Sequence, residues 1–441
     1  MLPLSNRPVQ GAIFVLLIIL LLFSLNSLYN ARANRGILGH HAGAPSYYGG
    51  LKVNGGKTAR RVYPAELLQR PLPRDLTSIP KLLHQSWINE TIPTKFEEWS
   101  ESCREVNSDW EWVLWTDEDN LKLVEKYAPW FNLTYEFLRS EIYRADAARN
   151  IYMHIFGGVY ADLDTECLLP YETMFEKHDT SAVLYSDSSF IDSKGERKAF
   201  FGRMGMDDDS MHSIPNAFMA STPGHPFWLL PIETADEMAT LAGMQPERLT
   251  GPIALRDQIL NYQEHYDAGQ GDGGIKLDEQ YAKSGWRHLY RPSSVKGVAR
   301  VPQSIVILPH FEVFPFSWQR DGDMFKDFCI ASAETFDSGK CKELMALDHW
   351  GSHSITYWSH SWGANGEGHW DDHLEAISKS NDKQVEAAGR QKIKGDGNVQ
   401  ESHDAAEAAK KVEDWRKKLD EADQNGERPA GNTSIEHRVE R

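Results

Sequence analysis

Cysteine, basic residues and long hydrophobic runs are all scarce in this sequence of 441 residues. There are four cysteines, and none of their spacings resembles a zinc site. Aspartate and glutamate outnumber lysine and arginine by 64 to 47, so no basic stripe is available to neutralise the phosphates of a nucleic acid. No internal repeat is evident. These shortages argue against a zinc-binding or nucleic-acid-binding protein and leave a chain long enough to bury one large core.

One long apolar run stands near the N-terminus. It covers residues 12–23 and extends with mixed residues to 29, which is close to the minimum length for crossing a bilayer. We therefore expect a short cytoplasmic tail over 1–10, a transmembrane signal anchor over 11–29 and a stem over 30–78. The alternative is a cleaved signal peptide, because residues 31–33 read Ala-Arg-Ala, the small-x-small form of a cleavage site. Either reading sends the rest of the chain into the secretory lumen.

The remainder of the chain divides into a folded part and a tail. Strand patterns at 81–86 and 112–115 are separated by a helical stretch at 93–106, and such alternation predicts an α/β domain with parallel strands. We place this domain at 79–371. Residues 372–441 are charged and poor in large apolar side chains, which predicts a largely disordered tail. Within it, 405–419 is expected to be a solvated segment, with a helix as the alternative.

The cysteines and the glycosylation sequons are consistent with a lumenal location. Cys103, Cys167, Cys329 and Cys341 allow three full pairings. We favour Cys329 with Cys341, which closes a short loop, and free buried thiols are the alternative. Sequons begin at Asn89, Asn132 and Asn432, a number close to chance for this length.

The most informative segment reads Gly-Gly-Val-Tyr-Ala-Asp-Leu-Asp over residues 157–164. It predicts a strand that ends in Asp162 and Asp164, and two residues that are two apart in a strand point to the same side. Paired carboxylates suit Mg²⁺ or Mn²⁺, ions that keep room for phosphate oxygens of a substrate. The alternative is an acidic turn that binds no ion.

A helix precedes this strand. Apolar residues recur at helical spacing over 144–156, and Gly157-Gly158 provides a stop. Asp146 and Arg149 are three residues apart and therefore share a face of this helix. They predict either a surface ion pair or a group that binds hydroxyls and phosphates beside the two aspartates.

This arrangement resembles a known family. The spacing Arg144-x-Asp146-x-x-Arg149, followed by Gly-Gly-x-Tyr160-x-Asp162-x-Asp164, is similar to the core of the glycosyltransferase family 32 enzymes. That family includes fungal Golgi mannosyltransferases and inositol phosphoceramide mannosyltransferases. Further blocks follow in the family's order at residues 79–87, 112–119, 216–226, 250–252 and 360–362.

The resemblance implies a fold and a set of site residues. The fold is the GT-A type of nucleotide-sugar transferases, a Rossmann-like α/β domain with a mostly parallel sheet. Asp162 and Asp164 would be catalytic and would hold Mn²⁺ or Mg²⁺. No residue is expected to act as a nucleophile. The residues expected to bind the donor are Arg149, Asp146, Trp87, Tyr160, Asn216 and Gly251. Core packing is an equal alternative for Trp87.

His360 is expected to complete the metal site, because similar enzymes carry a C-terminal histidine there. His349 and His353 are its local competitors. The common His-His pair ahead of Gly-Ser-Trp is absent from this sequence, so the ligand stays open between them. A packed core histidine is the alternative.

The resemblance implies retaining transfer of mannose from GDP-mannose to a lumenal acceptor, by an enzyme held in the Golgi membrane by a single type II anchor. The block at 112–130 favours an inositol phosphoceramide acceptor, whereas the absence of a second apolar segment near the C-terminus fits a glycoprotein glycan equally well. Alternatives are a galactosyl- or N-acetylglucosaminyltransferase that uses a UDP-sugar, and a non-catalytic lumenal glycan-binding protein of the same fold. A metal-dependent phosphohydrolase is a further one, with residues 207–209 as its only extra carboxylates.

Overall fold

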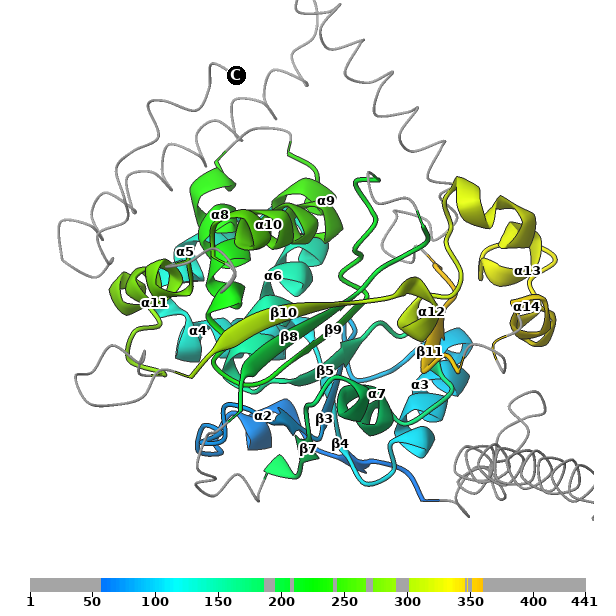
Figure 1. The fold of residues 1–441 in the computed structure, drawn as a ribbon, viewed down its shortest axis with the longest axis horizontal. Coiled ribbons are helices and arrows are strands. Elements are labelled where there is room, and N and C mark those ends of the chain that lie inside the picture. Colours follow the sequence, from blue (N-terminus) through cyan, green and yellow to red (C-terminus); the bar gives the residue numbers. More distant parts are fainter. Residues whose placement is uncertain are drawn as a thin grey trace, which may run out of the picture. The chain divides into compact units, whose positions relative to one another are not determined.

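A computed structural model describes residues 57–185, 195–206, 210–240, 244–266, 273–290, 301–345, 347 and 351–359. Within these residues a central sheet has the strand order β1-β4-β3-β5-β9-β8-β10 (Figure 1). The pairs β1 with β4, β4 with β3, β3 with β5, and β8 with β10 are parallel, while β9 runs antiparallel to both of its neighbours. The sheet strands are β1 (Arg60–Arg61), β3 (Leu82–Ser86), β4 (Glu111–Trp115), β5 (Gly158–Ala161), β8 (Arg197–Gly202), β9 (Phe218–Ser221) and β10 (Gln303–Leu308).

Two small sheets flank the central one, and helices connect the strands. β2 (Ile79–Pro80) pairs with β7 (Ala182–Val183), and β6 (Thr165–Cys167) pairs with β11 (Ser354–Thr356). The helices are α2 (Pro64–Leu67), α3 (Thr94–Val106), α4 (Asp117–Tyr127), α5 (Asn132–Phe137), α6 (Glu141–Ile155), α7 (Tyr171–Lys177), α8 (Leu229–Met238), α9 (Pro246–Leu249), α10 (Pro252–His265), α11 (Gly273–Lys283), α12 (His310–Val313), α13 (Lys326–Cys329) and α14 (Ser338–Leu344). The predicted mixed α/β class with a mostly parallel sheet is confirmed.

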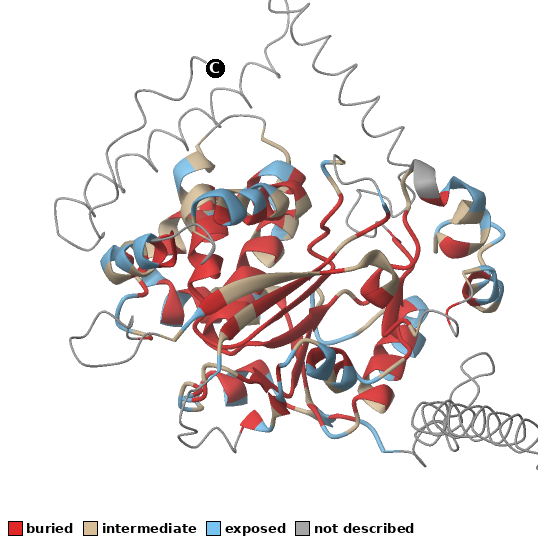
Figure 2. Cartoon of the chain, in the orientation of Figure 1, coloured by how far each residue is buried: buried red, intermediate tan, exposed pale blue. Residues whose placement is uncertain are grey.

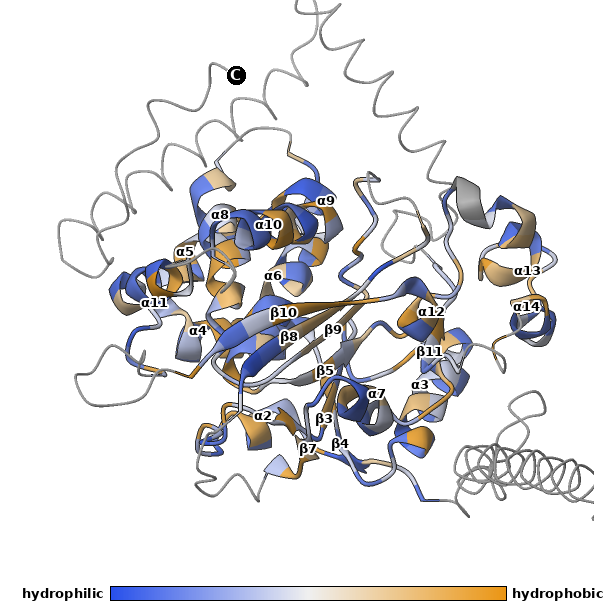
Figure 3. Cartoon of the chain, viewed as in Figure 1, coloured by the Kyte–Doolittle hydropathy of each residue, from blue (hydrophilic) through white to orange (hydrophobic). Residues whose placement is uncertain are grey.

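The core lies between the sheet and α6. Figure 2 shows the central strands and α6 in the colour of buried residues, whereas α11 and α14 present exposed faces. Figure 3 shows β9 and β10 largely in the colour of hydrophobic residues. Helix α6 packs against the sheet and against α4 and α8, so its polar side chains from Asp146 to His154 are buried together with the apolar ones. Polar groups buried in this way need hydrogen-bond or ion-pair partners.

Helix α6 ends where the sequence predicts. Phe156 caps it, and Gly157 follows with φ at +66° while its N–H donates to the Met153 carbonyl at 3.1 Å. A side chain at residue 157 would be strained by this φ, and its Cβ would lie 2.6 Å from the Ser221 carbonyl oxygen. Glycine is therefore required for the reversal that feeds α6 into β5.

The folded part begins before residue 79. β1 pairs with the edge of β4, and Val62, Leu67 and Leu68 are buried in the core. These residues lie in the segment expected to be a stem, so the last part of that segment, from about residue 60, is part of the folded domain. Its sequence has no sustained periodicity because β1 is two residues long and α2 is four.

All four cysteines are in disulfides. The favoured bond Cys329–Cys341 is confirmed and joins α13 to α14. The second bond, Cys103–Cys167, joins α3 to β6. The alternative of free buried thiols is wrong.

Several predicted features fall outside the described residues. They are the anchor at 11–29, the tail at 372–441 with its segment 405–419, the carboxylates at 207–209, and the histidines His349 and His360. In the part of the chain that the structure describes, no helix combines the length and apolarity needed to span a bilayer.

Candidate active site

Asp162 and Asp164 lie in the turn between β5 and β6. β5 ends at Ala161 and β6 begins at Thr165, so the expectation that both aspartates are strand residues is wrong. The Thr165 N–H donates to the Asp162 carbonyl at 3.1 Å and closes the turn. Both aspartates nevertheless line the same cleft, so the turn brings together the carboxylates that the strand was expected to align.

The C-terminal part of the described chain holds Asp164 in place. The Ser359 N–H donates to Asp164 Oδ2 at 2.7 Å, and the Tyr357 N–H donates to the Asp164 carbonyl at 2.9 Å. Burial, reinforced by the nearby Asp162 carboxylate, raises the pKa of Asp164 to about 6. Two negatively charged carboxylates this close repel each other, and a cation bound between them would relieve that repulsion.

Arg149 stands at the centre of the polar network beside this turn. Its guanidinium lies 3.2 Å from Asp146 Oδ1 and 3.5 Å from Asp162 Oδ1, and it donates to the Asn216 carbonyl at 3.1 Å. Its carbon Cζ lies 4.5 Å from the centre of the Tyr160 ring, and the Tyr160 hydroxyl donates to Asp162 Oδ1. The side chains of Arg149 and Asp146 are 7% and 6% exposed, so the alternative of a surface ion pair is wrong.

The network has further support from elements distant in the sequence. Asn216, just before β9, donates from Nδ2 to Asp146 Oδ1 at 3.0 Å. A Cβ on Gly251, at the start of α10, would lie 3.1 Å from Asp146 Oδ2 and 2.8 Å from the Glu247 Cα. Glycine at 251 therefore lets the backbone approach this carboxylate closely. Burial raises the pKa of Asp146 to about 6, and the charge of Arg149 opposes that rise.

A cleft of about 570 Å³ opens over these groups at the carboxyl ends of the parallel strands. Ligands of open α/β sheets bind at this edge. Of the predicted site residues, those that line the cleft are Trp87, Asp146, Arg149, Tyr160, Asp162, Asp164 and Asn216. Gly251 is adjacent through Pro252 and Glu247, which also line it.

Other lining residues were not predicted. Asp117 lies two residues after the end of β4, so the rule that ligands bind at strand ends provides a signal that would have found it. Trp318, Trp358 and Ser359 come from the C-terminal part of the described chain. No local sequence pattern predicts these residues, because they reach the aspartate turn only through the fold of the whole domain.

Of the three candidate histidines, the structure describes His353. His353 is buried away from the cleft, with Nε2 3.1 Å from the Thr173 hydroxyl, so it is not a ligand competitor at the aspartates. Among the described residues, no group of three or more His, Cys, Asp or Glu side chains is placed to hold a metal ion. Any ion at this site would therefore rely on the two aspartates within the described part of the chain.

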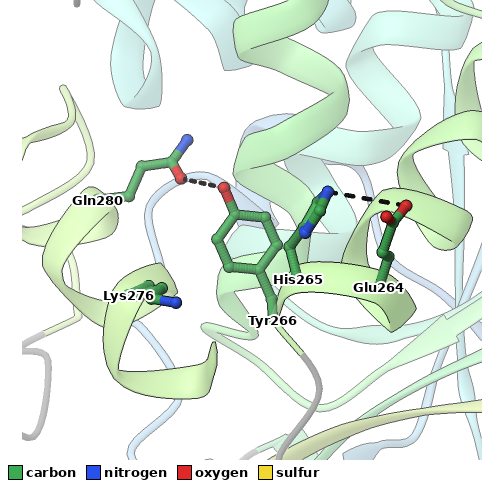
Figure 4. A pocket seen from close by; sticks show the side chains of 5 residues that line it. All are labelled: Glu264, His265, Tyr266, Lys276 and Gln280. Atoms are coloured by element: carbon green, nitrogen blue, oxygen red, sulfur yellow. Dashed lines mark hydrogen bonds and ion pairs between the residues drawn. The ribbon is translucent and has the colours of Figure 1, made fainter. Parts of the chain in front are cut away.

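A second hollow, of about 430 Å³, lies on the surface between α10 and α11 (Figure 4). The Tyr266 hydroxyl donates to Gln280 Oε1 at 3.1 Å, and His265 lies 3.7 Å from Glu264. These contacts are between side chains that line the hollow itself. It contains no carboxylate pair and does not lie at a strand end, so it is not the candidate active site.

Comparisons with known proteins agree with the geometry. Residues 93–181 match the family model described as a glycosyltransferase sugar-binding region containing a DXD motif. Mannosyl phosphorylinositol ceramide synthase SUR1 of Saccharomyces cerevisiae is 31% identical over 180 residues, which are 40% of this chain and 41% of the relative. Inositol phosphoceramide mannosyltransferase 3 of Schizosaccharomyces pombe is 39% identical over 90 residues, 20% of this chain and 25% of the relative.

These matches span less than half of the relatives' own length. A solved structure, the PaToxG glycosyltransferase, aligns with a TM-score of 0.31 at 16% identity, over 48% of this chain and 79% of that one. The matched family region contains α6, β5 and the aspartate turn. Residues 93–181 are thus similar to the DXD-containing sugar-binding region of glycosyltransferases, and parts of the chain are similar to inositol phosphoceramide mannosyltransferases.

Proposed function

We propose that this protein is a metal-dependent retaining glycosyltransferase of the GT-A type that moves mannose from GDP-mannose to a glycolipid or glycan acceptor. The names of its relatives support mannose and a phosphoceramide acceptor. The mostly parallel sheet, with a cleft at its carboxyl ends, supports the fold type.

The observation that carries the proposal is the charge of the cleft. Its described lining contains the carboxylates of Asp117, Glu141, Asp146, Asp162, Asp164 and Glu247, and its single Lys or Arg side chain is Arg149. Arg149 is already paired with Asp146 and Asp162. A diphosphate would meet strong repulsion here unless a cation accompanied it, because like charges at short range in a partly buried site are costly.

The residues present fit a divalent ion. Mg²⁺ and Mn²⁺ take carboxylate oxygens from one or two side chains and complete their shell with phosphate and water. Asp164 and Asp162 would hold the ion. When bound, it would neutralise the charge that develops on the leaving diphosphate. His360 follows Ser359 directly in the sequence and remains a proposed further ligand.

The side chains of the network would position the donor. Asp146, fixed by Arg149 and Asn216, would accept hydrogen bonds from sugar hydroxyls. Arg149 would stabilise negative charge near the diphosphate without reorganising, since its contacts already fix the guanidinium. Trp87 and Tyr160 add aromatic surface to the wall.

The compartment is part of the same proposal. We infer a Golgi membrane protein with a single N-terminal anchor and a lumenal catalytic domain. The two disulfides support an oxidising lumen.

The test uses donor binding and hydrolysis with purified full-length protein. GDP-mannose, UDP-galactose and UDP-N-acetylglucosamine are compared in Mn²⁺, in Mg²⁺ and in chelator. We expect GDP-mannose turnover that needs the ion and is lost in Asp164→Asn. Glu118→Gln is the control, because that exposed side chain pairs with Lys122 outside the cleft. Full activity in chelator, or in Asp164→Asn, would refute the metal mechanism, and turnover of a UDP-sugar alone would refute the donor.

A further inference from the structure

Trp87 and Asp117 lie on adjacent backbone segments at the edge of the cleft. The backbone pairing of β3 and β4 continues past the ends of both strands, with Trp87 N–H donating to the Trp115 carbonyl at 3.0 Å and Asp117 N–H to the Ile88 carbonyl at 3.5 Å. Both side chains line the cleft. The residues that follow β3 and β4 therefore present an aromatic ring and a carboxylate at the same edge of the sheet.

The Trp87 ring is held but not covered. Phe96 of α3 meets it edge-on, with 5.5 Å between ring centres. Trp87 is half-buried, so part of its surface faces the cleft. A flat base can stack on such a ring, and base-aromatic stacking is tolerant of base identity.

The Asp117 carboxylate is half-buried and accepts no hydrogen bond from any residue that the structure describes. The charged groups that act on it are Glu141 and Arg144 of α6. Burial, together with the Glu141 carboxylate, raises its pKa to about 6, and Arg144 opposes the rise. A half-buried carboxylate without donors is an acceptor site that a ligand with N–H groups would satisfy.

The nucleobases differ in what they offer to a carboxylate. Guanine presents N1–H and its exocyclic amino group on one edge, two donors side by side that match the two oxygens of a carboxylate. Uracil presents one N–H between two carbonyl oxygens, which repel a negative charge. A site with a carboxylate beside a stacking ring therefore favours guanine by attraction and disfavours uracil by repulsion.

We propose that Asp117 is a specificity-determining residue that accepts hydrogen bonds from the guanine edge of the donor while the base stacks on Trp87. This inference rests on the proposed function and names the residue that would select the guanine base of its donor. In this arrangement the base of the donor is selected at the end of the cleft next to β3 and β4, and the diphosphate lies near the aspartate turn.

The test measures binding of GDP and UDP to the full-length protein in Mn²⁺ by calorimetry, so that no acceptor is needed. We expect the wild type to bind GDP at least about tenfold more tightly than UDP. Asp117→Asn should reduce that ratio by at least about tenfold, because the amide keeps one acceptor and turns a donor toward guanine. Asp117→Ser serves the same purpose if the first variant does not accumulate.

Two further variants separate stacking on Trp87 from hydrogen bonding to Asp117. Trp87→Ala should weaken GDP and UDP by a similar factor, since stacking does not read the base edge. Glu118→Gln, one residue further along α4 but exposed, should change neither affinity.

An unchanged ratio of GDP to UDP affinity in Asp117→Asn, with Mn²⁺-dependent GDP binding intact, would overturn this inference and leave the proposed function standing. A wild type that prefers UDP would overturn both this inference and the proposed GDP-mannose donor. Failure of the wild type to bind either nucleotide would overturn both.

Discussion

Protonation of His84 is expected to make the stability of the fold depend on pH. The ring is buried in β3, where its Nε2 lies 2.9 Å from the Gly157 carbonyl and its Nδ1 accepts from Trp115 Nε1–H at 3.0 Å. These two contacts require a neutral ring with its proton on Nε2. A second proton on Nδ1 would face the indole N–H, so charging the ring breaks a hydrogen bond and buries a cation.

The size of the expected loss in stability follows from the lowered pKa of His84. Burial lowers the pKa of His84 to about 4, against 6.5 for an ordinary histidine. The unfolded chain therefore binds the proton more readily than the folded one, and the stabilisation is present above pH 6.5 and lost as the pH falls toward 4. Between pH 7.5 and pH 5, linkage gives a loss of about 2 kcal/mol from this one ring.

The assay is urea unfolding at pH 7.5 and pH 5 for the wild type and His84→Gln. The variant does not titrate at this position, so its deficit in unfolding free energy relative to the wild type should shrink by about 2 kcal/mol at the lower pH. Other buried groups occur in both proteins and cancel in the comparison. His265→Gln, which replaces an exposed side chain, is the control. An equal deficit at both pH values would refute the assignment of a neutral buried ring.

Three further predictions concern the framework of the site. Gly158→Ala should lower the free energy of unfolding by at least ~2 kcal/mol, because φ is +93° and the new Cβ would lie 2.6 Å from a backbone oxygen of β3. Gly351→Ala is the control, since that glycine also has a positive φ but its new Cβ would meet nothing within 4 Å, and it should cost less. Equal losses of melting temperature in the two variants would contradict the clash. Removing the Cys103 disulfide with Cys103→Ser should lower urea stability by up to ~4 kcal/mol, since the bond spans 64 residues, whereas an unchanged midpoint would show that the bond does not constrain the unfolded chain. Lys342→Met should lower the free energy of unfolding by ~3–5 kcal/mol, because it leaves the buried Glu166 carboxylate without its cation. Adding Glu166→Gln should recover much of this loss, and no recovery in the double variant would contradict the pairing.

Much of the fold was predictable because its signals are local. The spacing over residues 144–156 and the glycine pair after it predict α6 and its end, and alternating apolar runs predict β3 and β4. β1 was missed because two residues carry no period. The strand assignment of the two aspartates failed for a different reason, since β5 stops one residue before Asp162 and the sequence does not mark that boundary.

The site was predictable on the side formed by α6 and the aspartate turn. Asp146 and Arg149 are three residues apart, so their contact is a local property of a helix. The opposite wall is formed by residues such as Ser359, which lies 195 residues from the Asp164 carboxylate that it contacts. No spacing rule reaches that far, because such contacts depend on the topology of the whole domain.

The pairing of β11 with β6 bears on the order in which the protein is made and becomes active. β6 follows the aspartate turn directly, and β11 reaches it from a part of the chain that is translated much later. Contacts of such long separation form late, because loop closure costs entropy before the contact repays it. A nascent chain that has not yet exposed residue 359 to the solvent lacks the N–H that holds Asp164. The sheet can thus assemble during synthesis while the acidic turn is still incomplete, so the cleft takes its final form only when nearly the whole domain has left the ribosome.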